Sequence, residues 1–541
     1  MRARVCARLL SAFVLASLAA SAAAQPNVVA GRDISMSSVG VFQNGHSGVY
    51  PNGVVAFGIS TTACNPGTAT IPWFAQPNPN HPFIAFLIAR ETAGRFTQIS
   101  NRSYCKHPFS STNTLGCTPS CSGGPSTQLV VGCSDTYGGA MNGSYSLLGP
   151  PDEIDPWTGV WSMTCSYFDY GVPPQPTCDG QASSISYGSN PTAPPRCNVN
   201  DSALTVPGST YYAQAGWITA GELESLRGNN FVSRGFVPTF SGGAWSFGSL
   251  TTQLAGSVLQ RWSGATLDSN TNGADDGRLF VAGKVTGPTN GLFHYEFAAH
   301  NRDNDRGVAA FRLPICPGAR VENAGFEDID TNAANDWSFF QTPSEISWAG
   351  ATTNALRWNS IFNFWFDSDA APVTGPSVLL DQADAGPGLA TVSVTTTVPL
   401  GLYNVHLGPG CGAGSSPSLF AIGTPSNAAI PNASFALRTT GNAANAPVGL
   451  ILAYAPGTFD LGAGCTLYAA SVAGAAALVG AVCDGSGAAT FAAPVPSDPA
   501  LEGLTADVQA FSVQAGGPFL GSFAFSNGLQ VRLGNSIPTC P

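Results

Sequence analysis

Apolar and polar residues alternate along many short segments of this chain, which is the pattern of β-strands with one buried face. In ATVSVTTTV, from Ala390, the residues Val392, Val394, Thr396 and Val398 share one face and hydroxyl-bearing residues occupy the other. Further predicted strands are GVVAFGIS from Gly53, PFIAFLIA from Pro82, TQLVVG from Thr127 and RLFVAGKV from Arg278. The pattern predicts an all-β fold.

Two local signals predict a turn and a helix. In GSFAFSNGLQVRLG, Asn527-Gly528 stands between two alternating runs, which predicts a β-hairpin. In TAGELESLRG, Thr219 and Glu222 have the spacing of a capping box and Gly228 that of a helix end. This short, peripheral helix is the clearest one that the sequence predicts.

Composition divides the chain into three segments. Residues 1–24 have a basic start, an apolar block and small residues at the end, as in a signal peptide. We expect residues 25–398 to form a large N-terminal β-sandwich-like region, either undivided or as two subdomains with a break near residue 200. Residues 403–541, poorer in aromatics, have the length of a smaller C-terminal β-sandwich.

The charge and hydropathy of the chain limit the kinds of partner that we expect. The net charge is -11, and the only lysines are Lys106 and Lys284, so no basic stripe could bind a nucleic acid backbone. No window after the signal peptide has the roughly 18 uncharged apolar residues of a membrane span. We therefore expect a secreted protein, extracellular or periplasmic, without a transmembrane span.

The cysteines favour disulfides, because an exported chain folds in an oxidising compartment. One of the 14 lies in the signal peptide, which leaves an odd number and at least one thiol without an intramolecular partner. A bridge between Cys178 and Cys197 would close the Pro/Ser/Gly-rich loop between them. The spacing of Cys105, Cys117, Cys121 and Cys133 also fits a zinc site, which export disfavours. The disulfide candidates are Cys64, Cys105, Cys117, Cys121, Cys133, Cys165, Cys178, Cys197, Cys316, Cys411, Cys465, Cys483 and Cys540.

The segment FHYEFAAHNRDNDRG, from Phe293, concentrates groups that could carry chemistry. As a strand it places His294, Glu296 and His300 on one face, with the two histidines about 20 Å apart, too far to bind one ion. His294 and Glu296 remain a candidate metal pair, with a third ligand from His46, His81 or His107. The alternative is a solvated polar face over a buried Tyr/Phe face.

The segment DSNTNGADDG is a candidate calcium loop. Asp268, Asn270, Asn272 and Asp276 match loop positions 1, 3, 5 and 9, but Leu279 stands where a bidentate glutamate is expected. The same residues also suit a plain turn. Calcium is the one cofactor for which the sequence offers a loop, and the His294–Glu296 pair is the other candidate metal site.

Two further clusters have weak catalytic patterns. Cys105-Lys106-His107 places a thiol beside a base, but adjacent residues of an extended segment point to opposite faces. In PPDEIDPWTGVW, from Pro150, the three carboxylates Asp152, Glu153 and Asp155 could serve a glycosidase, and Trp157 and Trp161 could stack on sugar. Neither pattern is specific, and the common hydrolase and nucleotide-binding motifs are absent.

Three segments resemble a set of exported proteins of Planctomycetes-like bacteria. They are VVGCSDTYGGAMNGS from Val130, HYEFAAHNRDNDRGVAAFRLP from His294 and NALRWNSIFNFWF from Asn354. The resemblance implies a single large N-terminal β region and carries over no catalytic residue. RSYCKHPF, from Arg102, departs from that family at Cys105, which makes this cysteine a candidate for the odd thiol or for a bridge peculiar to this protein.

The tail is similar to a C-terminal β domain of many such secreted proteins, through HLGPGCGAGSSPSL, LGAGCTLY and SNGLQVRLG. Export, an acidic surface with few charges and the missing catalytic motifs predict a non-enzymatic extracellular or cell-envelope protein with a structural, adhesive or glycan-binding role. The alternative is a secreted, metal-assisted hydrolase that uses His294 and Glu296. Neither the ligand nor the disulfide pairing follows from the sequence.

Overall fold

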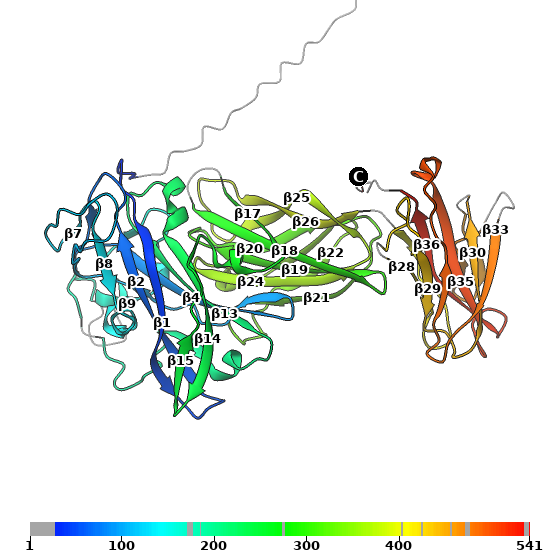
Figure 1. Ribbon diagram of the computed structural model, residues 1–541, viewed down its shortest axis with the longest axis horizontal. Coiled ribbons are helices and arrows are strands. Elements are labelled where there is room, and N and C mark those ends of the chain that lie inside the picture. The colour runs from blue at the N-terminus through cyan, green and yellow to red at the C-terminus, as the bar shows by residue number, and fades with distance from the viewer. Residues whose placement is uncertain are drawn as a thin grey trace, which may run out of the picture.

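The protein consists of three β-sandwiches that follow one another along the chain (Figure 1). The computed structural model describes residues 27–169, 177–183, 185–272, 276–401, 404–423, 426–454, 457–470, 476–534 and 540. Within these ranges the single α-helix is α1 (Gly139–Asn142), and the other helical segments are short 3-10 turns. The predicted all-β class is confirmed, whereas the predicted signal peptide, 1–24, lies outside the described residues.

The first sandwich packs two sheets around one core. The smaller sheet contains β1 (Ser35–Ser47), β2 (Val54–Cys64), β12 (Cys197–Asn200) and β8 (Ser134–Tyr137). The larger sheet contains β15 (Ala244–Gly248), β14 (Phe231–Ser241), β13 (Thr210–Ile218), β4 (Phe83–Thr92), β6 (Cys105–Lys106), β9 (Leu148–Gly149), β16 (Leu254–Ala255) and β5 (Arg95–Gln98). The core between them extends from Ile34 to Phe247 and includes the buried Trp73 and Trp217.

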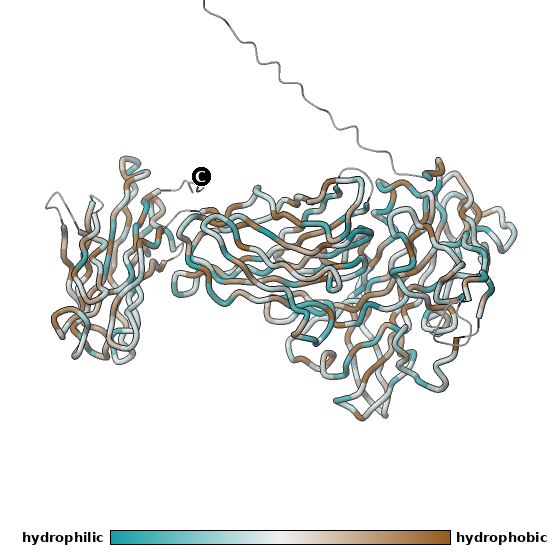
Figure 2. The backbone as a smooth tube through the Cα atoms, turned by 180° about the vertical axis from the view of Figure 1, so that it is seen from behind, coloured by the Kyte–Doolittle hydropathy of each residue, from teal (hydrophilic) through white to brown (hydrophobic). Residues whose placement is uncertain are grey.

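The second sandwich has two sheets of five strands. One contains β17 (Thr266–Thr271), β18 (Arg278–Thr289), β19 (Leu292–Asn301), β24 (Ser360–Ser368) and β21 (Val321–Glu327). The other contains β22 (Ser338–Gln341), β23 (Glu345–Ala349), β20 (Val308–Pro314), β25 (Ala371–Gln382) and β26 (Thr391–Gly401). In β26 Val392, Val394, Thr396 and Val398 are buried, as the alternation predicts. Figure 2 shows such alternation of hydrophobic and hydrophilic residues along the strands.

The third sandwich is smaller and stands at the far end from the first (Figure 1). Its five-stranded sheet contains β27 (Asn404–Gly408), β36 (Phe523–Arg532), β35 (Thr505–Val513), β30 (Pro447–Ala453) and β33 (Ala476–Val482). Its other sheet contains β28 (Ser418–Ile422), β29 (Ala436–Thr440) and β34 (Ala489–Ala492). The described residues also form small two-stranded sheets: β3 (Ile71–Pro72) with β7 (Gln128–Leu129), β10 (Ile154–Asp155) with β11 (Val160–Trp161), and β31 (Phe459–Gly462) with β32 (Cys465–Leu467).

The first and second sandwiches share a buried interface. Strand β4 is apolar on both faces because Ile84 and Phe86 belong to the first core, while Leu87 packs with Ala298 and Ile361 of the second sandwich. A continuous apolar run is the expected sequence of a strand buried on both sides. At the rim, the fully buried Asp303 pairs with Arg302 and with Arg227 of the first sandwich.

Several features of the described residues join the second and third sandwiches. The chain passes directly from β26 to β27, and a disulfide links Cys316 to Cys540, near the end of the chain. Cys540 also donates a backbone hydrogen bond to Leu400, at the end of β26. In addition, the hairpin between β18 and β19 reaches Phe420 of β28, where a Cβ on Gly291 would lie 2.6 Å from the Cβ of Phe420.

Ten cysteines form five disulfides, three in the first sandwich, one in the third and one between the second and third. The pairs are Cys64–Cys117, Cys121–Cys133, Cys165–Cys178, Cys316–Cys540 and Cys411–Cys465. The expected Cys178–Cys197 bridge is therefore wrong, since Cys178 pairs with the nearer Cys165. Of the described cysteines, Cys105, Cys197 and Cys483 are buried and unpaired.

Two local predictions are wrong for tertiary reasons. The segment from Thr219 is not an α-helix: it contains a 3-10 turn, Glu224–Asn229, and Glu222 is buried and accepts hydrogen bonds from Ile34 and Asn230 instead of capping. Asn527-Gly528 is not a turn, because both residues lie inside the continuous strand β36.

A break near residue 200, the alternative to an undivided N-terminal region, would fall inside the first sandwich. Strands β12 and β13, on either side of it, pair with β2 and β4. The first two cores separate later, between Phe247 and Leu279. We keep 403–541 as the proposed C-terminal domain. Within the described residues, no helix is long and apolar enough to cross a membrane.

Candidate functional site

The polar face of β19 is mostly an internal surface of the protein. His300 is fully buried, and its Nδ1 lies 2.8 Å from the hydroxyl of Ser257. Burial lowers the pKa of His300 to about 3, so this ring is neutral. Tyr295 and Phe297 pack into the second core on the other face, as expected. The prediction that the polar face is solvated is wrong for the residues after His294, because the first sandwich covers them.

His294 stands at the open end of this face with its side chain 40% exposed. Its Nδ1 lies 2.6 Å from Oδ1 of Asp367, and its Nε2 lies 2.9 Å from Oε1 of Glu296. The hydrogen bond with Glu296, followed by that with Asp367, raises the pKa of His294. Carboxylates only accept hydrogen bonds, so a ring that bonds to both of them uses both nitrogens as donors and has no lone pair for a metal ion.

Glu296 is neutralised by Arg95 from the first sandwich. The guanidinium group binds both carboxylate oxygens, with Nε 2.9 Å from Oε2 and Nη2 2.6 Å from Oε1. It also lies over the ring of Trp365 at 3.4 Å and within 3.6 Å of Glu327. Burial raises the pKa of Glu327. This charged cluster, centred on Arg95, fixes the β4–β5 hairpin to the second sandwich.

The three histidines expected as further ligands lie elsewhere. His46 pairs with Asp201 at 2.8 Å, and His81 Nε2 lies 2.9 Å from His107 Nδ1. Burial lowers the pKa of His81 to about 4. In the described part of the chain no group of three or more His, Cys, Asp and Glu side chains has the arrangement of a metal site.

The calcium candidates are divided between a strand and a loop. Asp268 and Asn270 lie in the extended strand β17, where Asn270 donates a hydrogen bond to the carbonyl of Ser393. Asn272 bonds to Asp276, which also pairs with Arg306 at 3.0 Å. A calcium loop curls around its ion, whereas an extended strand holds its side chains apart. Residues 273–275 lie outside the described residues.

The cysteines considered as zinc ligands or as a nucleophile are either disulfide-bonded or buried. Two of the four candidate zinc ligands, Cys121 and Cys133, are bonded to each other, and Cys117 is bonded to Cys64. Cys105 is fully buried, which raises its thiol pKa far above the usual value. A buried thiol with a high pKa is not an activated nucleophile.

The acidic cluster after Pro150 is used in local contacts. Asp152 pairs with Arg102 at 2.5 Å, and Glu153 accepts a hydrogen bond of 2.7 Å from the backbone of Tyr167. Asp155 caps a turn by accepting from the backbone of Thr158. Both neighbouring tryptophans, expected as sugar platforms, are buried, with 7% and 3% exposure. Asp152 also lines an open, charged cleft of about 490 Å³ together with Arg102, Asp305 and Asp384, but neither Trp157 nor Trp161 lines this cleft.

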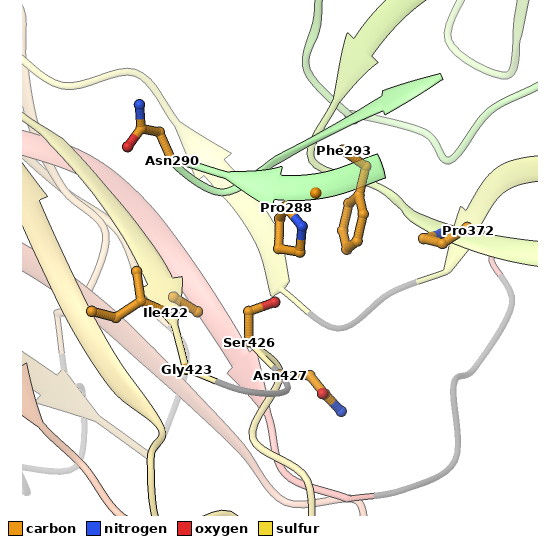
Figure 3. A pocket seen from close by; sticks show the side chains of 10 residues that line it. Pro288, Asn290, Phe293, Pro372, Ile422, Gly423, Ser426 and Asn427 are labelled. Carbon is orange, nitrogen blue, oxygen red and sulfur yellow. The ribbon is translucent and has the colours of Figure 1, made fainter. Parts of the chain in front are cut away.

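An open cleft of about 500 Å³ lies between the second and third sandwiches (Figure 3). From the second sandwich, Pro288 and Phe293 of the β18–β19 hairpin and Pro372 of β25 line it. From the third, its walls include Ile422, Ser426 and Asn427. Figure 3 shows Pro288 and Phe293 across the opening from Ser426.

The described side chains that line the cleft are uncharged. It combines the ring of Phe293 with the amides of Asn290 and Asn427 and the hydroxyl of Ser426, and none of its described lining residues is charged. Asn290 has φ +52°, the left-handed conformation that Asn tolerates at turns. The Gly-Pro-Thr-Asn-Gly stretch signals a turn in the sequence, but nothing in it indicates the third sandwich as its neighbour.

The comparisons with known proteins assign no family to this chain. No model of a known protein family matches it, and neither does any curated protein. The resemblance to exported proteins of Planctomycetes-like bacteria therefore stays a prediction.

Among solved structures, the chain is similar to BcpA, the major pilin subunit of Bacillus cereus. A variant of BcpA has 10% identity and a TM-score of 0.18, over 60% of this chain and 78% of that chain. BcpA itself has 9% identity and a TM-score of 0.17, over 64% and 88%. Values this low identify neither the topology nor the function of this chain.

Proposed function

We propose that the protein is an exported, non-enzymatic adhesion protein of the cell surface or extracellular space, and that it binds neutral glycans in the cleft between its second and third sandwiches. The observation that carries this proposal is the neutral lining of the cleft around Phe293. Sugars present C–H faces to aromatic rings and hydroxyl groups to amides and hydroxyls, and a cavity of this size accommodates one or two sugar units.

The covalent structure supports the location and the preformed shape of the cleft. Five disulfides are typical of proteins outside the cytoplasm. The Cys316–Cys540 bridge and the Gly291–Phe420 contact hold the two walls of the cleft together. A preformed site spends less free energy on ordering when a ligand binds.

The hydrolase alternative has less support. It requires His294 and Glu296 to be available to a metal ion or a substrate. Instead, His294 is held between two carboxylates and Glu296 is held by Arg95. The carboxylates of this cluster serve to join two sandwiches.

Binding to arrays and columns of neutral and acidic polysaccharides tests the proposal. Phe293→Ala removes the ring, and Asn290→Gly removes an amide while keeping a residue that tolerates positive φ. We expect wild type to retain neutral glycans and each variant to bind them about tenfold more weakly, the effect of losing about 1.4 kcal/mol. Phe340→Ala, which removes a 54% exposed ring outside the cleft, is the matched control. Unchanged binding by both cleft variants, or no retained neutral glycan, would reject the proposal.

A further inference from the structure

Strand β33 forms an unprotected edge of the third sandwich. It pairs with β30 on one side in regular register, and within the described residues no strand pairs with its other side. Its sequence, AALVGAV, contains no charge and no proline. Edge strands of monomeric proteins usually carry charges, prolines or bulges that prevent pairing with another chain. Within the described residues this edge has none of these, and no strand pairs with the backbone donors and acceptors on its outer side.

The sheet surface next to this edge is an open apolar groove of about 490 Å³. Its open floor is Gly480, which pairs with Gly449 across the strands, and Leu478 and Val482 lie beside it with 66% and 67% exposure. Phe511 forms the opposite wall. Contiguous exposed apolar surface of this kind marks an interaction site more often than a solvated face.

The strand is complementary to itself. If two copies pair antiparallel with Val479 facing its own counterpart, Leu478 of each copy stands opposite Gly480 of the other. Residues 478, 480 and 482 share one face of the strand, so each leucine extends over the glycine floor of the second copy's groove. The protruding side chain of Leu478 and the space over Gly480 that receives its counterpart are thus two residues apart on the same strand.

We propose that β33 pairs with β33 of a second copy of this chain, which joins two five-stranded sheets into one continuous sheet across a two-fold axis. Such an interface uses the same surface on both subunits. The strand carries no charge, so two chains of net charge -11 meet without like charges in the contact. Because β33 lies at the end of the molecule away from the first sandwich, the first sandwiches of the pair stand at opposite ends (Figure 1).

The mass of the purified full-length protein, measured by light scattering during gel filtration from about 1 to 100 µM, tests the proposal. We expect a dimer that dissociates on dilution.

Gly480→Val is the decisive variant, because a Cβ on Gly480 meets no atom within 4 Å in the single chain and valine favours a strand. It fills the space for Leu478 of the second copy, and we expect at least a tenfold weaker dimer. Leu478→Lys should have the same effect, whereas Leu504→Lys, at another exposed leucine of the third sandwich, should have none.

Cross-linking locates the contact. Val479→Cys places a thiol on the proposed two-fold axis, and we expect a disulfide-linked dimer on mild oxidation. Val513→Cys, on the opposite wall of the groove, should cross-link far less. A monomer at every concentration, or a dimer that survives both Gly480→Val and Leu478→Lys, would overturn the proposal.

Discussion

At the scale of single residues, the buried Lys106 is a local source of instability. Its Nζ has no hydrogen-bond partner in the structure and faces the rings of Phe109 and Tyr137 at 5.1 and 5.6 Å. Burial lowers its pKa to about 7 from the ordinary value of 10.5. Between these values the unfolded chain binds more protons than the folded one, so this residue makes stability rise with pH.

Lys106→Met should therefore stabilise the protein at pH 7, by about 1–4 kcal/mol in the free energy of unfolding, because it removes a buried amine that has no hydrogen-bond partner. The gain should shrink toward pH 10, where the amine is neutral in both states. Urea unfolding of both proteins, followed by tryptophan fluorescence at several pH values, measures it. Lys284→Met removes the only other lysine, whose Nζ lies 3.5 Å from Glu91, and should change stability by less than about 1 kcal/mol. A loss of stability in Lys106→Met would contradict this account.

At the scale of elements, Gly528 shows why a turn signal can fail. A Cβ on Gly528 would lie 2.4 Å from Cβ of Tyr468, so the glycine permits a close approach of that ring inside β36. Asn527 is engaged as well, because its side chain binds the backbone of Leu419. Glycine serves turns and close contacts alike, and only the third sandwich's packing distinguishes them.

Gly528→Ala should destabilise the third sandwich by about 1–3 kcal/mol through overpacking. Hydrogen exchange of peptides from β35 and β36, read by mass spectrometry, reports on this sandwich alone. All ten tryptophans lie before residue 366, so fluorescence would not detect the change. Gly485→Ala is the matched control, since a Cβ there meets nothing within 4 Å. Equal exchange in the two variants would refute the packing argument.

Other elements show what alternation can and cannot predict. The strands containing Val55, Ile84, Leu279 and Val392 follow from local patterns, because one or two buried faces require those residues. The surroundings of His294 do not, since Asp367 and Arg95 come from strands that the sequence leaves unplaced. The hairpin residues of the cleft likewise lie more than 100 positions before Ile422 and Ser426, and no local pattern pairs them.

At the scale of the whole molecule, the Cys316–Cys540 disulfide closes a loop of 224 residues that includes the third sandwich. If a site for a sequence-specific protease is placed between β26 and β27, the cut protein should stay in one piece. Reductant, or the Cys540→Ser variant, should separate it into two. Electrophoresis with and without reductant reads the result, and Cys411→Ser, which opens a bridge within the third sandwich, should not release it. Two fragments without reductant in the wild-type background would contradict the bridge.

The same bridge determines how the molecule bears a load. A pulling force applied beyond Cys540 passes through the disulfide to Cys316 and from there into the strands of the second sandwich. The third sandwich is a side branch of that path, so tension along the chain does not unfold it. When the chain is pulled in this way, the strands of the third sandwich keep their resting conformation while the second sandwich is under strain.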